Sequence, residues 1–240
     1  MASTVARRVR HAKTRARASR DPRTRLDVDE RRAQLVTLGV QHFGERAYDD
    51  VSIDAIADAA GISKGLLYHY FPTKRAYYAA VIEEAAARLV ESTETDEAAP
   101  PLERLQAGLD AYLGYVKQHA KAYATLMRSG VGVDPGIARI VDQTRTLFIE
   151  RLTSGFLDGS APGVMGVDRA GYATGILRAP IVRLALRGWV GFAEAASLGW
   201  TEAIAAGAPA PSQDEMRELL AGALMEIVRA ATLKLARSPR

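Results

Sequence analysis

The segment 52–74 reads SIDAIADAAGISKGLLYHYFPTK, and its residue types predict two short helices separated by a tight turn. Apolar residues recur at helical spacing in Ile53–Ala59 and in Lys64–Tyr70. Gly61 lies between them and can adopt the left-handed backbone conformation that ends a helix. Two short helices joined in this way form a helix-turn-helix unit, which we expect at residues 52–71.

Hydroxyl residues mark the points where helices of this unit begin. Ser52, Ser63 and Thr73 each precede a helical pattern, where a side-chain oxygen can accept a hydrogen bond from a free backbone N–H group. A longer helix is expected on each side of the unit, at about Asp29–Phe43 and from Thr73 to about Ser92. We expect their buried stripes to be Ala33, Val36, Val40 and Phe43 in the first helix and Ala76, Ala79, Ala80 and Leu89 in the second.

The second short helix carries side chains suited to DNA. A helix fits the major groove, and its first residues reach the base edges. Ser63 and Lys64 supply a hydroxyl and an ammonium group there, Gly65 permits close approach of the backbone, and Leu66 can lie against a thymine methyl group. Lys74 can hold a phosphate beside the amides that begin the next helix. Three aromatic residues have polar tips suited to phosphates and sugars: Tyr68, His69 and Tyr70.

This arrangement resembles the DNA-binding unit of the TetR family of bacterial transcriptional regulators. The similarity covers residues 31–81 and is most specific in Gly61–Lys74, where the pattern is Gly-x-Ser-x-Gly-x-x-Tyr-x-x-Phe-x-x-Lys. The resemblance implies contact with double-stranded DNA at positions that commonly touch it in the family, which here are Ser52, Lys64, Gly65, Tyr68, His69, Tyr70 and Lys74.

Packing is the competing interpretation for the apolar residues of the unit. We expect Leu67 and Phe71 in the core, with Ile53, Ile56 and Ile62 joining the two short helices. Three residues differ from those common in the family: Ala47 replaces a glycine, Leu66 a small polar residue and Tyr70 a histidine. Because alanine disfavours positive φ, the turn at Ala47 should adopt a conformation without it.

The rest of the chain also reads as helices, so we expect an all-α fold. A loop at Thr93–Pro101 precedes the following helices, and Pro180 should kink or split the longest of them. The expected helices are Leu102–His119, Ala122–Arg128, Ile137–Leu157, Asp168–Ala205 and Ser212–Arg237. We expect three regions: a basic tail (1–27), a helix-turn-helix domain (28–75) and a helical domain for ligand binding and dimerisation (76–240).

Composition argues against other classes of protein. The chain has no cysteine, which excludes disulfides and thiolate metal sites, and its four histidines lie apart from carboxylates. We therefore expect no metal or other cofactor. No apolar run is long enough to cross a membrane. An enzyme is not expected, because no phosphate loop or nucleophile elbow occurs, and the Gly-x-Ser at Gly61–Ser63 lies between helices rather than after a strand.

Small residues near the C-terminus suggest a surface for close helix packing. Such a surface could pair two copies of the chain, or it could be an ordinary core face within one copy. The resemblance favours a homodimer, because the last two long helices of the family form a four-helix interface. The candidate interface residues are Gly188, Gly191, Phe192, Ala195, Gly199, Leu220, Ala223 and Ile227.

The middle helices are the expected site of a small-molecule effector. Aromatic and methionine side chains at helical spacing can line a pocket, although the same pattern is common in a plain core. The candidates are Tyr112, Tyr115, Tyr123, Met127, Phe148, Phe156, Tyr172 and Trp189. Arg128, Arg145 and Arg178 could recognise an acidic group on the ligand, or they could be solvated.

Taken with the resemblance, these features predict a homodimeric repressor that binds a palindromic operator and is released by its effector. We expect it in the bacterial cytoplasm, at the nucleoid. The alternative is a ligand-binding or protein-interaction module that has kept the fold but does not bind DNA. That alternative is consistent with the charge of residues 29–75, which carry six basic and seven acidic side chains.

The N-terminal tail has the opposite charge balance. Residues 1–25 contain nine Lys or Arg residues and one acidic residue, with almost no large apolar side chain, so we expect them to be disordered alone. The tail could contact DNA phosphates, or it could be a solvated extension; its composition also resembles an organelle transit peptide.

Deleting residues 1–25 tests the phosphate-contact interpretation. We expect weaker binding at all DNA sequences alike and a flatter salt dependence, by about 0.9 log unit for each phosphate that the protein no longer neutralises. Binding measured over a range of salt concentrations, with and without these residues, gives the slopes. An unchanged slope would show that the tail does not contact phosphates.

Overall fold

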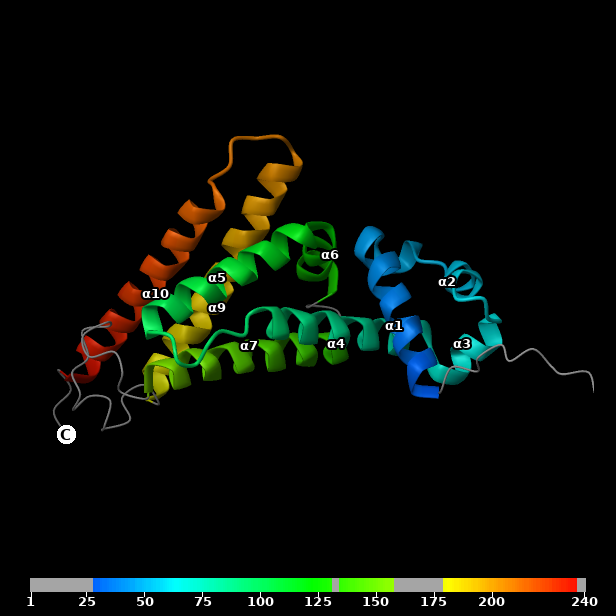
Figure 1. Cartoon of the computed structure of the whole chain (residues 1–240), viewed down its shortest axis with the longest axis horizontal. Coiled ribbons are helices and arrows are strands. Elements are labelled where there is room, and N and C mark those ends of the chain that lie inside the picture. The colour runs from blue at the N-terminus through cyan, green and yellow to red at the C-terminus, as the bar shows by residue number, and fades with distance from the viewer. Residues whose placement is uncertain (1–27, 131–133, 158–178, 237–240) are drawn as a thin grey trace, which may run out of the picture.

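A computed structural model describes residues 28–130, 134–157 and 179–236, which form helices and no strand (Figure 1). The all-α fold is thereby confirmed. The helices are α1 (Val28–Glu45), α2 (Ile53–Ala59), α3 (Lys64–Tyr70), α4 (Lys74–Ser92), α5 (Pro101–Gln118), α6 (Ala120–Thr125), α7 (Pro135–Leu157), α9 (Pro180–Ala205) and α10 (Gln213–Ala236), with short turns η1 (Tyr48–Asp50) and η2 (Leu126–Gly130). The basic tail, Tyr172 and Arg178 lie outside the described residues.

The helices form an elongated molecule in which the helix-turn-helix lies at one end. Figure 1 shows α1, α2 and α3 gathered at that end, and α9 and α10 as a hairpin at the other. Helices α4 and α7 pack against each other between the two ends. No helix of the described parts is long and apolar enough to cross a membrane.

Helix capping sets the boundaries of the helix-turn-helix as the sequence predicts. The hydroxyls of Ser52, Ser63 and Thr73 accept hydrogen bonds from the backbone N–H groups three residues later, at 3.2, 3.2 and 3.0 Å. Gly61 has φ of +65°, the left-handed conformation expected of the turn. Ala47 has φ of −61°, so the first loop avoids positive φ, as predicted.

Pro180 is the first residue of α9. It occupies the first turn of α9, where a missing N–H group costs no intrahelical hydrogen bond. The part of the expected helix before this point, from Asp168, lies almost entirely outside the described residues.

Near the middle of the chain, the segment expected as one helix from Ala122 to Arg128 is instead α6 followed by the π-helical turn η2.

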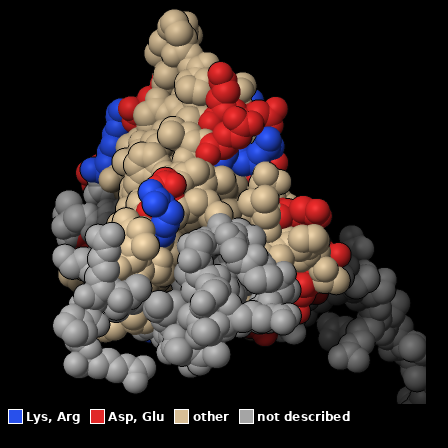
Figure 2. All heavy atoms as spheres, turned by 90° about the vertical axis from the view of Figure 1, so that its left-hand side faces the viewer, with Lys and Arg blue, Asp and Glu red and all other residues tan. Residues whose placement is uncertain are grey.

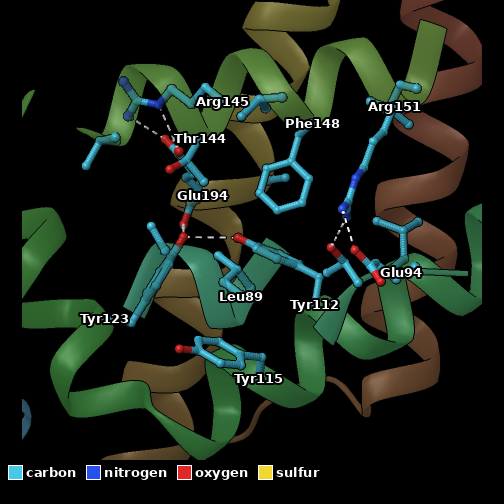
Figure 3. A pocket seen from close by; sticks show the side chains of 18 of the residues that line it. Leu89, Glu94, Tyr112, Tyr115, Tyr123, Thr144, Arg145, Phe148, Arg151 and Glu194 are labelled. Atoms are coloured by element: carbon cyan, nitrogen blue, oxygen red, sulfur yellow. Dashed lines mark hydrogen bonds and ion pairs between the residues drawn. The ribbon is translucent and has the colours of Figure 1, made fainter. Parts of the chain in front are cut away.

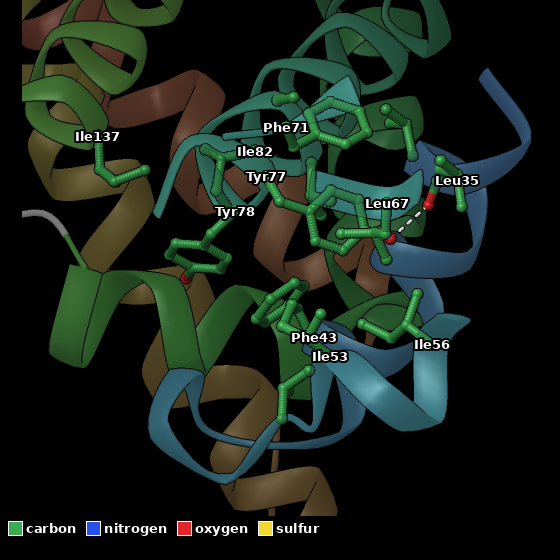
Figure 4. Close-up of a cluster of buried hydrophobic side chains, with 14 of the residues drawn as sticks. Leu35, Phe43, Ile53, Ile56, Leu67, Phe71, Tyr77, Tyr78, Ile82 and Ile137 are labelled. Carbon is green, nitrogen blue, oxygen red and sulfur yellow. Dashed lines mark hydrogen bonds between the residues drawn. The ribbon is translucent and has the colours of Figure 1, made fainter. Parts of the chain in front are cut away.

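One buried cluster fixes the helix-turn-helix, and we call it the headpiece core (Figure 4). Leu67 of α3 and Ile56 of α2 are fully buried in it, as the sequence predicts, and Tyr77 of α4 is fully buried beside them. The Tyr77 hydroxyl donates a hydrogen bond to the backbone oxygen of Leu35 in α1. The cluster also includes three residues of α7: Ile137, Ile140 and Val141.

The expected buried stripes of the flanking helices are partly wrong. Ala33 is exposed, and the inner face of α1 is instead Leu35, Val36, Gly39 and Phe43. In α4, the buried residues are chiefly large ones that the alanine pattern does not indicate: Tyr77, Tyr78, Val81 and Ile82, together with the expected Ala80. Tyr77 and Val81 of α4 fill the space beside Gly39 of α1, so neither stripe follows from one helix alone.

A second buried cluster joins α5, α7, α9 and α10. Its centre includes Trp189, whose indole Nε1 donates a 2.9 Å hydrogen bond to the backbone oxygen of Leu220. Leu220 has no exposed surface within one copy of the chain. The expectation that Leu220 lies in a dimer interface is therefore wrong, because its side chain packs inside the bundle.

Gly39 provides a test of the contact between α1 and α4. An added Cβ at this position would lie 2.3 Å from Val81 Cγ2 and 2.7 Å from the Tyr77 hydroxyl. We expect Gly39→Ala to lower the free energy of unfolding by about 1–3 kcal/mol through overpacking. Urea denaturation measures this change.

Gly44→Ala is the matched control in the same helix. An added Cβ there would meet only the Ala122 Cβ, at an ordinary 3.5 Å, so this variant should be neutral or slightly more stable. Equal stability of the two variants would contradict the close packing of α1 on α4.

Candidate functional site

The exposed surface of α3 carries most of the residues expected to contact DNA. Leu67 holds the helix from its buried side. The remaining side chains are accessible: Ser63, Lys64, Gly65, Leu66 and His69 are exposed, and Tyr68 and Tyr70 are half-buried. Leu66 is 41% exposed, so its apolar side chain is accessible on the same surface.

Lys64 lies beside the start of α2. Its Nζ is 2.9 Å from Asp54 Oδ2, and both side chains are largely exposed. The hydrogen bond with Asp54 raises the pKa of Lys64, so the lysine is charged over the whole physiological range. This ion pair joins the first turn of α2 to the first turn of α3, which brings the exposed Ser52 and the start of α3 to the same region.

Lys74 is held at the start of α4 by the loop before α2. Its Nζ donates a 3.2 Å hydrogen bond to the backbone oxygen of Asp49 and lies 4.8 Å from the centre of the Tyr48 ring. Burial, and then the nearby Asp49 carboxylate, raise the pKa of Tyr48, so this ring stays neutral beneath the ammonium group. Lys74 is therefore a positioned cation rather than a freely moving one.

A cavity of about 540 Å³ lies among the helices behind the headpiece core. Helices α4, α5, α6, α7 and α9 supply most of its wall. Six of the eight residues expected to line an effector pocket do line it: Tyr112, Tyr115, Tyr123, Met127, Phe148 and Trp189. The Phe156 side chain and Tyr172 lie outside the described residues.

A polar network crosses the middle of this cavity (Figure 3). Arg145 of α7 forms two hydrogen bonds with the Glu194 carboxylate of α9, at 2.9 and 2.7 Å. The hydroxyls of Tyr112 and Tyr123 lie 3.0 Å apart, and Tyr123 also donates to the Glu194 backbone oxygen at 3.3 Å. Burial raises the pKa of both tyrosines, which remain neutral and can offer hydrogen bonds to a ligand.

The arginines suggested by the sequence are mostly engaged in ion pairs. Arg128 pairs with Glu202 and Arg145 with Glu194. Arg145 lines the cavity as expected, and the wall also includes two arginines that the sequence reasoning missed, Arg104 and Arg151. Helical spacing on α5 places Arg104 one turn before Gly108 and two before Tyr112, and this spacing is the signal that could have identified it.

Small and apolar residues are exposed along the described parts of α9 and α10. Figure 2 looks onto this end of the molecule, where uncharged side chains make up much of the described surface and charged ones lie among and around them. Five of the candidate interface residues are exposed along α9: Gly188, Gly191, Phe192, Ala195 and Gly199. Ala223 and Ile227 of α10 are half-buried, and the exposed neighbour of Leu220 is Leu219, which is 51% exposed.

The Arg145–Glu194 pair yields a prediction about stability. The two side chains are only 24% and 17% exposed, so Glu194→Gln leaves a largely buried guanidinium without its partner. We expect a decrease of about 1–3 kcal/mol in the free energy of unfolding. Urea denaturation measures the decrease, and the double variant Arg145→Met with Glu194→Gln should recover part of it.

The exposed pair Arg229–Glu226 on α10 supplies the control. Its side chains are 57% and 67% exposed, so Glu226→Gln should change stability little. If Glu194→Gln reduced stability as little as Glu226→Gln, the Arg145–Glu194 pair would be solvated, which would contradict its burial in the cavity.

Two family models match separate parts of the chain. Residues 35–81 match the description "Bacterial regulatory proteins, tetR family". Residues 101–162 match "Tetracyclin repressor-like, C-terminal domain". The first covers α2, α3 and most of the headpiece core, and the second covers α5, α6 and α7 along the cavity.

Curated relatives and a solved structure give the same result. The chain is 32% identical over 120 residues to the transcriptional activator FasR of Mycolicibacterium smegmatis, covering 48% of this chain and 53% of FasR. It is 28% identical over 148 residues to the repressor KstR2 of Mycobacterium tuberculosis, covering 59% of this chain and 74% of KstR2. The match thus spans about half the length of FasR.

The full helical arrangement is similar to that of a crystal structure from Streptomyces coelicolor, described as a tetR-family transcriptional regulator. The TM-score is 0.68 at 29% identity, over 89% of this chain and 92% of the other. The likeness therefore extends through both buried clusters, beyond the helix-turn-helix.

Proposed function

Because the chain belongs to the TetR family of bacterial regulatory proteins, we propose that it is a transcriptional regulator that binds DNA through α3. The observation that carries this proposal is the division of α3 into a buried side and a polar exposed side. Leu67 is fully buried, while Lys64 and His69 are exposed. This short helix exposes a hydroxyl, an ammonium group and ring tips at its solvent face, as a major-groove reader requires.

The active form is proposed to be a homodimer joined by α9 and α10. Ile181 and Leu184 of α9 and Leu219 and Leu233 of α10 are between 37% and 69% exposed in one copy. Glycine and alanine residues between the exposed residues of α9 would let a second helix approach closely. Pairing two identical faces gives a two-fold dimer, which matches a palindromic operator with one half-site for each α3.

An effector in the cavity would release the operator. Ile82 and Val141 both line the cavity and belong to the headpiece core, so a ligand there touches the residues that position α3. A ligand that prefers one arrangement of the headpieces shifts the population toward it. We favour repression over activation, because the similar KstR2 and DhaR are named repressors, although FasR is named an activator.

The place of action follows from this function, since a regulator of this kind works in the bacterial cytoplasm, at the nucleoid.

A binding module that does not touch DNA is the alternative. The near-neutral charge of residues 29–75 and the exposed Leu66 favour it. Enzymatic catalysis is not proposed, because the family consists of transcriptional regulators.

The test is DNA binding by variants of the exposed surface. An operator is first selected from random duplexes with the full chain, and affinity is then measured by fluorescence anisotropy. Lys74→Ala should weaken binding to all sequences alike and reduce the salt slope by about 1, as expected for a phosphate contact. Tyr68→Ala should also weaken binding, and both variants should keep their helical circular dichroism.

Lys117→Ala is the matched control. Lys117 is exposed on α5, and its Nζ lies 6.0 Å from the Trp200 ring, far from α3 in the fold. This variant should bind as the unchanged protein does. Normal operator binding by both Lys74→Ala and Tyr68→Ala, or no selected operator at all, would favour the module that does not bind DNA.

A further inference from the structure

The cavity is long and follows one helix. Residues of α5 line it every three or four positions from Pro101 to His119, the residue that follows α5. A helix rises 1.5 Å per residue, so the wall between Arg104 and His119 is about 22 Å long. Helix α7 runs along the same space from Val141 to Leu152. The cavity is therefore a channel between α5 and α7 rather than a rounded pocket.

Its volume matches one extended chain of atoms. At roughly 30 Å³ for each small group, about 540 Å³ holds about 18 non-hydrogen atoms. An extended chain advances about 1.2 Å per atom, so about 22 Å also corresponds to about 18 atoms in line. Because the two estimates agree, the channel has room along its length for one linear chain.

Two arginines mark one end of this channel. Arg151 donates hydrogen bonds to the Val90 backbone oxygen at 2.6 Å and to Thr93 Oγ1 at 3.1 Å, so it lies against the loop that follows α4. Gly108 lies against the same loop, since its added Cβ would meet Thr95 Cγ2 at 3.7 Å. Arg104 is one helical turn before Gly108 and therefore lies at the same end as Arg151.

Arg151 already has an acidic partner, because it pairs with Glu94 at 3.3 Å, and Glu94 lines the channel too. Arg104 is half-buried, and no carboxylate of the described residues lies within ion-pair distance of it. The acids at this end, Glu94 and Glu97, are exposed. Exposed carboxylates are screened by water, whereas a half-buried guanidinium gains much from an anion beside it.

The opposite end of the channel is apolar and belongs to the headpiece core. Val40 of α1, Ile82 of α4 and Val141 of α7 line it there. All three are in or against the headpiece core. A ligand long enough to extend from Arg104 to these residues would therefore contact the packing that positions α3.

We propose that the channel binds a linear amphipathic anion of about 18 non-hydrogen atoms, with a carboxylate or phosphate at Arg104 and Arg151 and an apolar tail against Val40, Ile82 and Val141. This proposal rests on the effector cavity of the proposed function, and it does not depend on DNA binding. The ligand would lie in one direction, with its charged head group at the arginines and its tail toward the headpiece core. This orientation also makes the length of the tail, rather than binding as such, the determinant of release.

Direct binding tests the chemical class. Calorimetry with the full chain and no DNA compares tetradecanoate, tetradecyl phosphate and 1-tetradecanol. We expect one anion bound per chain, with the alcohol weaker by on the order of tenfold or more. A preference between the carboxylate and the phosphate identifies the head group. Equal binding of the alcohol and the anions, or no binding of any, would overturn the proposal.

Variants test the direction. Arg104→Gln should weaken tetradecanoate by on the order of tenfold and leave 1-tetradecanol unchanged, because only the anion uses the guanidinium. Arg139→Gln, at an exposed position of α7 outside the channel wall, should change neither. Equally weakened binding of acid and alcohol in Arg104→Gln would indicate a structural role and contradict the proposal.

Chain length tests the regulatory part. Ala86 lines the channel one turn beyond Ile82, so Ala86→Leu should shorten it near the headpiece. This variant should weaken tetradecanoate more than octanoate, and octanoate should bind the unchanged protein without releasing DNA. Release by octanoate as complete as by tetradecanoate would refute the length dependence. If the protein bound no DNA but showed the expected calorimetry, the proposed regulator would fail while the ligand assignment stood.

Discussion

The burial of one side of α3 is the constraint on which the rest of the structure depends. A seven-residue helix is not stable alone in water, so tertiary packing must hold it. Leu67 and Phe71 supply that packing against Tyr77, whose hydroxyl reaches back to the Leu35 backbone oxygen in α1. With this side fixed, the polar side of α3 has a defined direction and can act as a reading surface.

The same packing connects the reading surface to the channel. Helix α4 contributes Tyr77, Val81 and Ile82 to the headpiece core. Farther along α4, Leu89 lines the channel, so the same helix contacts both the core and the channel. Helix α7 also contacts both regions: Ile137 near its start lies in the headpiece core, and later residues of α7 line the channel. Close-packed helices transmit displacement because their interior has few voids. The proposed ligand and the DNA would thus act on one continuous layer of side chains.

The sequence predicted the local features of this structure well, because they depend on neighbouring residues. The boundaries of α2 and α3 follow from Ser52, Gly61 and Ser63, whose effects act within a few residues. Aromatic and methionine residues at helical spacing also predicted six of the residues that line the channel. Features that depend on two helices at once were not predicted, such as the burial of Tyr77 against Gly39.

Helix α10 shows the same limit at the proposed dimer surface. Both of its faces carry apolar residues, so the sequence cannot tell which face turns inward. Packing against α9 and α5 buries Met216 and Leu220 and leaves Leu219 and Leu233 outside. Arg104 was missed for a related reason, because a lone arginine on α5 becomes notable only once the channel beside it is known.

The central claim is that two copies of α3 read the major groove of one DNA duplex, and methylation protection tests it most directly. Dimethyl sulfate modifies guanine N7, which faces the major groove, on the selected operator with and without the protein. If both copies bind, two protected patches appear on one face of the duplex, separated by about one helical turn or a multiple of it. A single protected patch, or unchanged guanine reactivity at saturating protein, would contradict the claim.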